Sequence, residues 1–246
     1  MTKKLHLDLN CDLGEGAGHD AELMPLITSA NIACGSHAGD AATMRATVAL
    51  AQQHGVAIGA HPGFADRENF GRREIVLPVA ELQQLVSRQI CAVALFGPVR
   101  HVKPHGALYN LAARDATVAG AVVAAVRATE ASLLLYALAG SELVRAGRAA
   151  GVRVAEEVFA DRTYQRDGSL TPRNRPDALI NDEAAAVAQV LRMVREGVVL
   201  STDGVEVPVV ADTICVHGDG PHAVAFATRL NAELRGAGIA VRAFGV

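Results

Sequence analysis

The stretch that decides the fold is LHLDLNCDL, residues 5–13. Side chains of a β-strand point alternately to its two faces. One face of this strand carries leucines and Cys11, whereas the other carries Asp8, Asn10 and Asp12. An open parallel sheet covered by helices on both sides needs two apolar faces. A closed barrel needs only one, because polar side chains inside it can hydrogen-bond one another. The stretch therefore predicts one strand of a barrel with a polar lumen.

Short β-rich runs alternate with longer helical runs along the 246 residues. Strands are expected over 5–10, 29–33, 56–60, 99–103, 133–138, 152–158, 213–217 and 239–244. Helices that end near a glycine are expected over 39–53, 79–96 and 181–196, and a small hairpin over 198–210. Such alternation is typical of parallel strands with helices outside. We therefore predict one domain over 1–246, an irregular (β/α) barrel of about seven parallel strands.

Polar residues gather at the expected carboxyl ends of five strands. They are Asp12, His37, His61, His105, His217 and Asp219. In a (β/α) barrel these ends meet at the face that carries the active site. Lys103 shares an inward strand face and must pair with Asp8, Asp12 or a bound anion, since an isolated buried charge is costly. The alternation along 152–158 also favours Glu157 over Glu156 as the inward carboxylate. The pattern predicts a convergent active site.

A metal site is one interpretation of this cluster. One carboxylate and two imidazoles, such as Asp12, His37 and His61, suit zinc or another divalent ion. The same groups can transfer protons without a metal, and the chain has no HExxH motif. We favour a site without a metal, while the residue pattern leaves both interpretations open. The chain also lacks the GxxxxGK[ST] loop, so a nucleotide would need an unconventional site.

Composition argues against several classes of protein. Lys and Arg number 23 and Asp and Glu 26, and the chain has no Trp, which is a poor basis for binding nucleic acid. Asp8 and Asp12 interrupt the first apolar stretch, unlike the core of a signal peptide. The longest other apolar run, 118–126, is half of the ~18 residues that span a bilayer. Four cysteines without CxxC spacing indicate reduced thiols in a cytoplasmic protein, and Cys91 is expected in the core.

Several motifs together resemble the LamB/YcsF family over essentially the full chain. They are LNCDLGEG (9–16), NIACGSHAGD (31–40), GAHPGF (59–64), FGRR (70–73), VKPHGALYN (102–110), Glu157 with ADR (160–162) and Tyr164, and CVHGD (215–219). Members of this family are similar to glycoside hydrolases and polysaccharide deacetylases in fold. The resemblance thus implies an irregular seven-stranded (β/α) barrel, in agreement with the alternation of side chains.

The resemblance also implies a reaction, the ATP-dependent opening of the 5-oxoproline (pyroglutamate) lactam to L-glutamate. The chain would be one component of a 5-oxoprolinase with two partner subunits, B and C, and could itself form an oligomer. We hypothesise that the lactam oxygen is phosphorylated before water attacks. Asp12 would then be the base for water and His61 or His105 the acid for the leaving nitrogen. Lys103, helped by Arg72, would stabilise the developing negative charge.

Other residues are expected to bind the substrate. They are Asn10, Asn31, His37, Arg72, Glu157, His217 and Asp219. Two alternative functions stay open at this stage. The first is metal-dependent deacetylation of N-acetylated sugars, and the second is a non-catalytic subunit that only presents substrate to its partners. The many ionisable groups expected in the lumen argue against mere binding.

Overall fold

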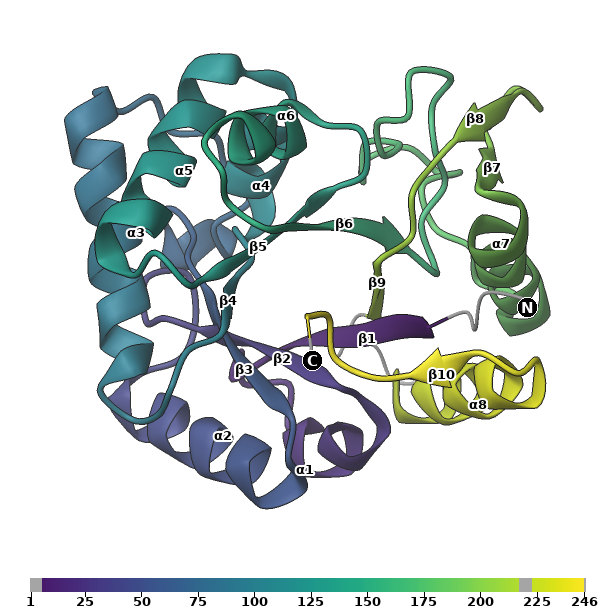
Figure 1. Cartoon of the computed structure of the whole chain (residues 1–246), viewed down its shortest axis with the longest axis horizontal. Coiled ribbons are helices and arrows are strands. Elements are labelled where there is room, and N and C mark those ends of the chain that lie inside the picture. The colour runs from purple at the N-terminus through teal and green to yellow at the C-terminus, as the bar shows by residue number, and fades with distance from the viewer. Residues whose placement is uncertain (1–5, 217–222, 246) are drawn as a thin grey trace.

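Parallel strands form a closed barrel in the computed structural model, which describes residues 6–216 and 223–245 (Figure 1). The barrel strands are β1 (His6–Leu13), β2 (Ser29–Ala33), β3 (Ala57–His61), β4 (His101–Val102), β5 (Leu134–Leu138), β6 (Val154–Phe159) and β9 (Thr213–Val216). They are hydrogen-bonded in that order, and β9 pairs with β1 to close the ring. The predicted irregular barrel of about seven parallel strands is confirmed.

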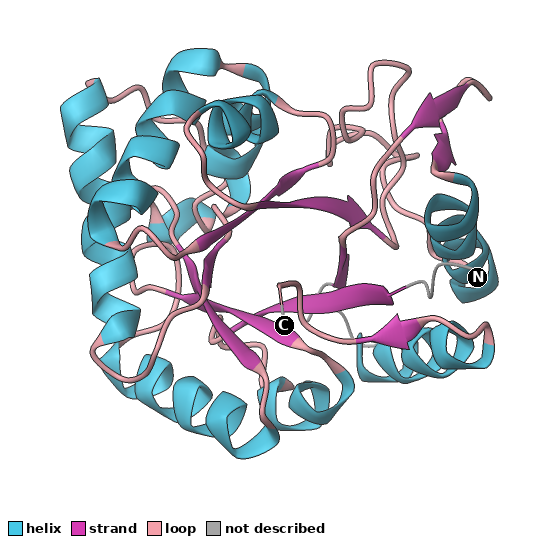
Figure 2. Ribbon diagram, viewed as in Figure 1, coloured by secondary structure: helices cyan, strands magenta, loops and turns pink. Residues whose placement is uncertain are grey.

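Helices surround this ring of strands (Figure 2). They are α1 (Asp20–Leu23), α2 (Ala41–His54), α3 (Val79–Ala94), α4 (Gly106–Arg114), α5 (Ala116–Thr129), α6 (Glu142–Ala149), α7 (Glu183–Glu196) and α8 (Ala223–Gly236). The predicted hairpin is present as the antiparallel pair β7 (Val198–Leu200) and β8 (Glu206–Pro208). A last short strand, β10 (Ala240–Val241), pairs with the start of β1 outside the ring.

Of the three helices predicted to end near a glycine, α2 and α7 do so and α3 does not. Asp40 accepts a hydrogen bond from the backbone N–H of Thr43 at the start of α2, which ends at Gly55 with a φ of 67°. A left-handed backbone of this kind favours glycine at the end of a helix. By contrast, α3 ends at Ala94, before Gly97. A Cβ atom at Gly97 would lie 2.7 Å from Val48, so this glycine permits close packing and does not cap the helix.

Some strands are shorter than the sequence predicts. The expected strand over 99–103 is reduced to β4, which contains His101 and Val102 only. Pro98 and Pro104 flank this segment, and a proline has no N–H to continue a strand ladder. The expected strand over 239–244 is likewise reduced to β10. His217, the predicted end of the seventh barrel strand, lies outside the described residues.

The two faces of β1 separate as the alternation predicts. Leu7, Leu9 and Cys11 are fully buried in the hydrophobic core between barrel and helices, whereas Asp8 and Asn10 belong to the lumen. Burial of apolar surface of this kind contributes roughly 25 cal/mol for each Å². Within 6–216 and 223–245, no helix has both the length and the apolar character needed to cross a membrane.

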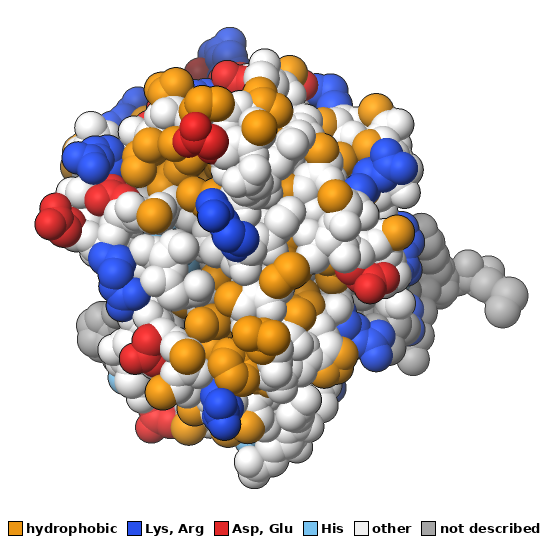
Figure 3. All heavy atoms as spheres, turned by 90° about the vertical axis from the view of Figure 1, so that its left-hand side faces the viewer, with side chains coloured by type: hydrophobic (Ala, Val, Ile, Leu, Met, Phe, Trp, Pro, Cys, Tyr) orange, Lys and Arg blue, Asp and Glu red, His pale blue; other side chains and the backbone are white. Residues whose placement is uncertain are grey.

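The expectation for Cys91 is wrong, because this thiol is exposed. Val86, Ile90 and Val93 form the buried face of α3, and residue 91 lies about 100° further around the helix. The surface that includes α3 also shows hydrophobic side chains between isolated charges (Figure 3). Val79 in α3 and Leu95 just after it are 45% and 81% exposed. Apolar side chains therefore do not identify the core here unless the helical period is also considered.

Candidate functional site

The deep part of the lumen is a network of hydrogen-bonded polar groups. Asp8 accepts hydrogen bonds from the hydroxyls of Thr28, Ser29 and Thr213 at 2.5–2.7 Å. Burial raises the pKa of the Asp8 carboxyl, although these hydroxyls act in the opposite direction. His101 stacks on the ring of Tyr136 with 4.2 Å between centroids. Burial lowers the pKa of His101 to about 3, so this layer contains a neutral imidazole.

Lys103 occupies the centre of the lumen one layer nearer the mouth. Its Nζ lies 3.0 Å from Asp12 Oδ1 and 2.8 Å from Glu157 Oε1. It also donates to Asn10 Oδ1 at 3.2 Å and lies 3.0 Å from Cys215 Sγ. Burial alone would lower the pKa of Lys103, but Asp12, Cys215 and Glu157 raise it well above its usual value. The ammonium therefore stays charged.

The predicted partners of Lys103 are confirmed in part. Lys103 pairs with Asp12, one of the expected carboxylates, and the inward carboxylate of β6 is Glu157, as the alternation predicts. Glu156 instead accepts a hydrogen bond from Arg148 at 2.6 Å. Asp8, the other expected carboxylate, instead accepts the hydroxyl hydrogen bonds of the deep layer. The lumen thus has a charged layer above a layer of hydroxyls and neutral rings.

Three histidines surround Glu15 beside this lysine. Glu15 Oε1 lies 3.2 Å from His37 Nε2, 3.4 Å from His105 Nδ1 and 3.8 Å from His61 Nε2. Asp12 Oδ2 is 3.4 Å from His61 Nε2. We call Glu15, His37, His61 and His105 the histidine cluster. One possible ligand atom from each lies within 4.8 Å of the others. The sequence placed Asp12 with two of these histidines, whereas the structure groups Glu15 with all three.

The charge state differs among the three rings. Burial lowers the pKa of His37 and of His105 to about 3, and the neighbouring His61 acts in the same direction on both. Burial also acts to lower the pKa of His61, but Asp12 and Glu15 outweigh it and raise that pKa. His37 and His105 are therefore neutral at neutral pH, which leaves each with a lone pair.

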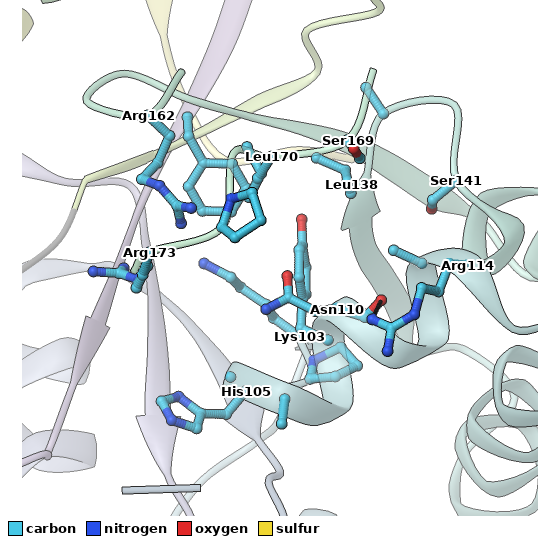
Figure 4. Close-up of a pocket in the computed structure, with 18 of the residues that line it drawn as sticks. Lys103, His105, Asn110, Arg114, Leu138, Ser141, Arg162, Ser169, Leu170 and Arg173 are labelled. Atoms are coloured by element: carbon cyan, nitrogen blue, oxygen red, sulfur yellow. Dashed lines mark hydrogen bonds between the residues drawn. The ribbon is translucent and has the colours of Figure 1, made fainter. Parts of the chain in front are cut away.

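A cavity of about 760 Å³ opens above these residues. Its lining includes the side chains Asp12, Glu15, His61, Lys103 and His105, with Arg72, Arg114, Arg145, Arg162 and Arg173 around them. Arg162 and Arg173 lie on one side of the pocket, Arg114 lies on the other, and Lys103 lies between them (Figure 4). Residues within 62–77 and 161–179, the segments that follow β3 and β6, both contribute to this lining. The cavity therefore combines acid–base groups with several arginines, of which Arg114 and Arg145 are paired with Glu74 and Glu142 in the same lining.

The predicted site residues occupy three positions relative to this cavity. Asp12, His61, Lys103, His105 and Arg72 line it. Four other predicted residues do not line the cavity: Asn10, Asn31, His37 and Glu157. They are buried and form hydrogen bonds or ion pairs with residues that do line it. His217 and Asp219 lie outside the described residues. No site role was expected for Arg162 or His101, because neither residue stands in a motif with a readable mechanism of its own.

Arg162 is a cation whose environment favours an anionic ligand. It is 5% exposed, and its guanidinium donates to the carbonyl oxygens of Thr171 and Ala178 at 2.6 and 3.3 Å. Burial lowers its pKa to about 10, which still leaves it protonated at neutral pH. A guanidinium fixed in this way on the wall of a pocket suits a carboxylate or phosphate ligand.

Comparisons with known proteins agree on the family. The model of the LamB/YcsF family matches residues 7–246. A protein of Brevibacillus brevis, named as the A subunit of 5-oxoprolinase, is 53% identical over 96% of this chain and 97% of that protein. The crystal structure of a lactam utilization protein from Thermus thermophilus superposes with a TM-score of 0.91 at 46% identity, covering 98% of this chain and all of that one. A T48 deacetylase is similar in fold alone. It superposes with a TM-score of 0.52 at 14% identity, covering 97% of this chain and 87% of that one.

Proposed function

We propose a function for this chain from the premise that it belongs to the LamB/YcsF family: it is the A subunit of a cytoplasmic 5-oxoprolinase. It would open the lactam of 5-oxoproline to L-glutamate in an ATP-consuming complex with the B and C subunits. The names of the relative from Brevibacillus brevis and of the structure from Thermus thermophilus support this proposal. The observation that carries it is the Asp12–Lys103 pair, 3.0 Å apart, at the floor of a large cavity.

The chemistry needs activation because a lactam is an unreactive amide. Transfer of the terminal phosphoryl group of ATP to the lactam oxygen would give an activated imidate and ADP. Attack of water on the same carbon would then break the carbon–nitrogen bond and leave an acyl phosphate, and a second water would hydrolyse this acyl phosphate to L-glutamate and phosphate. The cavity of about 760 Å³ is in the usual range for small-molecule sites and is larger than one five-membered ring requires. It therefore has room for a phosphorylated lactam.

Asp12 is suited to accept the proton of the attacking water. Its Oδ1 is fixed by Asn31 at 2.9 Å and by Lys103 at 3.0 Å, and its side chain is 15% exposed. A carboxylate that is oriented and still reachable from a cavity meets the geometric requirement for a general base. We assign the second proton transfer, to the leaving ring nitrogen, to the same carboxyl group. One proton then passes from water to nitrogen by way of Asp12.

This assignment narrows the roles expected for His61 and His105. His61 Nδ1 faces the carbonyl oxygen of Lys103 at 2.7 Å, and His105 Nε2 faces that of Phe70 at 2.8 Å. Both N–H groups are thus directed at backbone and away from the cavity. We propose that neither ring is the acid.

The cations would hold the charge that develops during the reaction. Lys103 lies beside Asp12 at the floor, where its ammonium can stabilise a negatively charged intermediate. Arg162 and Arg72 line the cavity above it and would bind the substrate carboxylate and the phosphoryl group. Arg72 lies 5.0 Å from the ring of Phe70, which helps to fix its guanidinium.

Product analysis tests the proposal directly. The chain is mixed with 5-oxoproline and ATP, with and without the proposed B and C subunits, and glutamate and ADP are measured. We expect glutamate to form with equal amounts of ADP, only when ATP and all three subunits are present. A mixture that forms ADP and no glutamate, or no product at all, would contradict the proposed function.

A further inference from the structure

Two rings of the histidine cluster have their hydrogen positions set by backbone. A carbonyl oxygen only accepts hydrogen bonds, so the nitrogens that face one must carry the hydrogen. These are His61 Nδ1, 2.7 Å from the oxygen of Lys103, and His105 Nε2, 2.8 Å from the oxygen of Phe70. When both rings are neutral, the opposite nitrogens, His61 Nε2 and His105 Nδ1, each present a lone pair.

The possible ligand atoms of the four side chains lie close together. His61 Nε2 and His105 Nδ1 lie 3.0 Å apart. Glu15 Oε1 is 3.8 and 3.4 Å from them, and His37 Nε2 is 3.2 Å from the same oxygen. Where both atoms of such a pair carry lone pairs and no hydrogen lies between them, they repel one another in a buried site, where water does not screen them. A cation at their centre turns this repulsion into coordination.

The distances fit a tetrahedral ion. Zinc lies about 2.0–2.1 Å from histidine nitrogen and carboxylate oxygen, which places neighbouring ligand atoms of a tetrahedron about 3.3 Å apart. Four of the six distances between these ligand atoms run from 3.0 to 3.8 Å, and all six are within 4.8 Å. Histidines that bind metals also tend to donate their other N–H to a carbonyl or carboxylate oxygen. His61 and His105 both do so.

Burial and charge favour a divalent cation at this place. His37 and His61 are 1% exposed, and the Glu15 side chain is 9% exposed. Three carboxylates, of Asp12, Glu15 and Glu157, stand beside the single ammonium of Lys103. Buried charge of one sign is costly unless it is compensated. A doubly charged cation provides that compensation.

We propose that Glu15, His37, His61 and His105 bind one divalent transition-metal ion, with Zn²⁺ as the best fit, at the floor of the cavity. Imidazole nitrogens select such ions over Mg²⁺ and Ca²⁺, which prefer oxygen ligands. Asp12 is not a member of this ligand set, because Lys103 and Asn31 already hold its Oδ1. Glu15, His61 and His105 line the cavity, so the ion would be adjacent to a bound ligand.

Metal titration of the full-length chain tests this site without 5-oxoproline or ATP. Protein treated with a chelator and dialysed is titrated with Zn²⁺ by calorimetry and with Co²⁺ by visible absorption. We expect one ion per chain and the intense visible bands of tetrahedral Co²⁺. Failure to bind a stoichiometric ion would overturn the proposal. So would the weak spectrum of octahedral Co²⁺, or a thiolate-to-metal band that places the ion on a cysteine.

Matched histidine variants locate the ion. His37→Gln removes a ligand that does not line the cavity, and His101→Gln removes an equally buried histidine outside the histidine cluster. We expect His37→Gln to weaken Zn²⁺ binding by at least about 100-fold, the upper end of the loss caused by removing an outer partner of a metal ligand. His101→Gln should bind like the wild type.

Equal affinity in His37→Gln and the wild type, or equal losses in both variants, would overturn the assignment. Circular dichroism checks that each variant folds. If His37→Gln does not fold, Glu15→Gln replaces it with the same expected loss, and the Co²⁺ spectrum of the wild type needs no variant. Because metal binding is measured without substrates, its outcome and that of the lactam assay are independent.

Discussion

Asp8 and Asp12 stand four residues apart on the same face of β1, yet they have different surroundings. Asp8 is 1% exposed and is surrounded by three hydroxyls. Asp12 pairs with Lys103 and lines the cavity. The comparison shows that one strand face can supply both a structural carboxylate and a reactive one. Depth in the lumen decides between them, since the carboxyl ends of the strands lie at the open face.

Two histidines, one in β4 and one just after it, differ in the same way between a deep position and a position at the cavity. His101 stacks on Tyr136 and shares a 2.8 Å hydrogen bond with Asn31, deep in the lumen. His105, four residues later, stacks on His37 with 3.8 Å between centroids and lines the cavity. We therefore expect substitutions in the deep layer to change stability and substitutions at the mouth to change activity.

The largest difference should separate the two aspartates. Asp12→Asn retains the shape of the side chain but removes the base, so glutamate formation by the assembled subunits should fall by about 10²–10⁴-fold. Asp8→Asn is the matched control and should leave turnover near the wild-type rate. Turnover close to normal in Asp12→Asn, with folding confirmed by circular dichroism, would refute the role of Asp12.

Lys103 should affect both activity and stability, because it is buried in the charged layer and pairs with Asp12 and Glu157. Lys103→Met leaves Asp12 and Glu157 as buried carboxylates without their ammonium partner. We expect the free energy of unfolding to drop by about 3–5 kcal/mol, measured by urea denaturation. The double variant Lys103→Met with Glu157→Gln should recover part of this loss. Losses that simply add would show that the pair is not coupled.

A smaller effect is expected for Asp8→Ala, which removes the acceptor for Thr28, Ser29 and Thr213. Buried hydroxyls without a partner should cost about 1–3 kcal/mol of unfolding free energy. Thermal or urea unfolding measures this loss, while turnover of the folded fraction should stay unchanged. A strong fall in turnover at full folding would place Asp8 with Asp12 and remove the distinction between the layers.

The last expected effect is a dependence of stability on pH, which should be comparable in size to that of Asp8→Ala between pH 6.5 and 5. The pKa of His101 is about 3 in the folded chain, against an ordinary value of 6.5, so below pH 6.5 the unfolded chain binds the additional proton. The contribution of His101 to stability is therefore complete above pH 6.5 and declines by about 1.4 kcal/mol per pH unit as the pH falls towards 3. His101→Gln should show a shallower decline between pH 6.5 and 5. Parallel curves for the two proteins would contradict this assignment.

Much of the fold could be predicted from local patterns. The strand 29–33 and the helix end at Gly55 follow from alternation and from turn chemistry, and the structure has both. β4 is shorter than predicted because flanking prolines end its ladder, and Cys91 is exposed because helical phase, not residue type, decides burial. These errors arise where one local signal competes with another.

The candidate site was predictable in part. The inward direction of Asp12, Lys103 and Glu157 follows from the period of two, which holds in any strand. The pairing of Lys103 with Glu157, and the position of Glu15 among the histidines, do not follow from it. Both depend on how loops and strands far apart in sequence approach each other, as do the carbonyl contacts that orient His61 and His105.

By itself, the sequence determined which side chains of β1 face inward, because backbone geometry alternates them regardless of their surroundings. Only the tertiary structure decided that Asp8 is enclosed by hydroxyls while Asp12 meets a lysine and a cavity. The physical reason is that burial and neighbouring charge depend on closure of the ring. Closure brings β9 against β1, although the two strands stand near opposite ends of the chain.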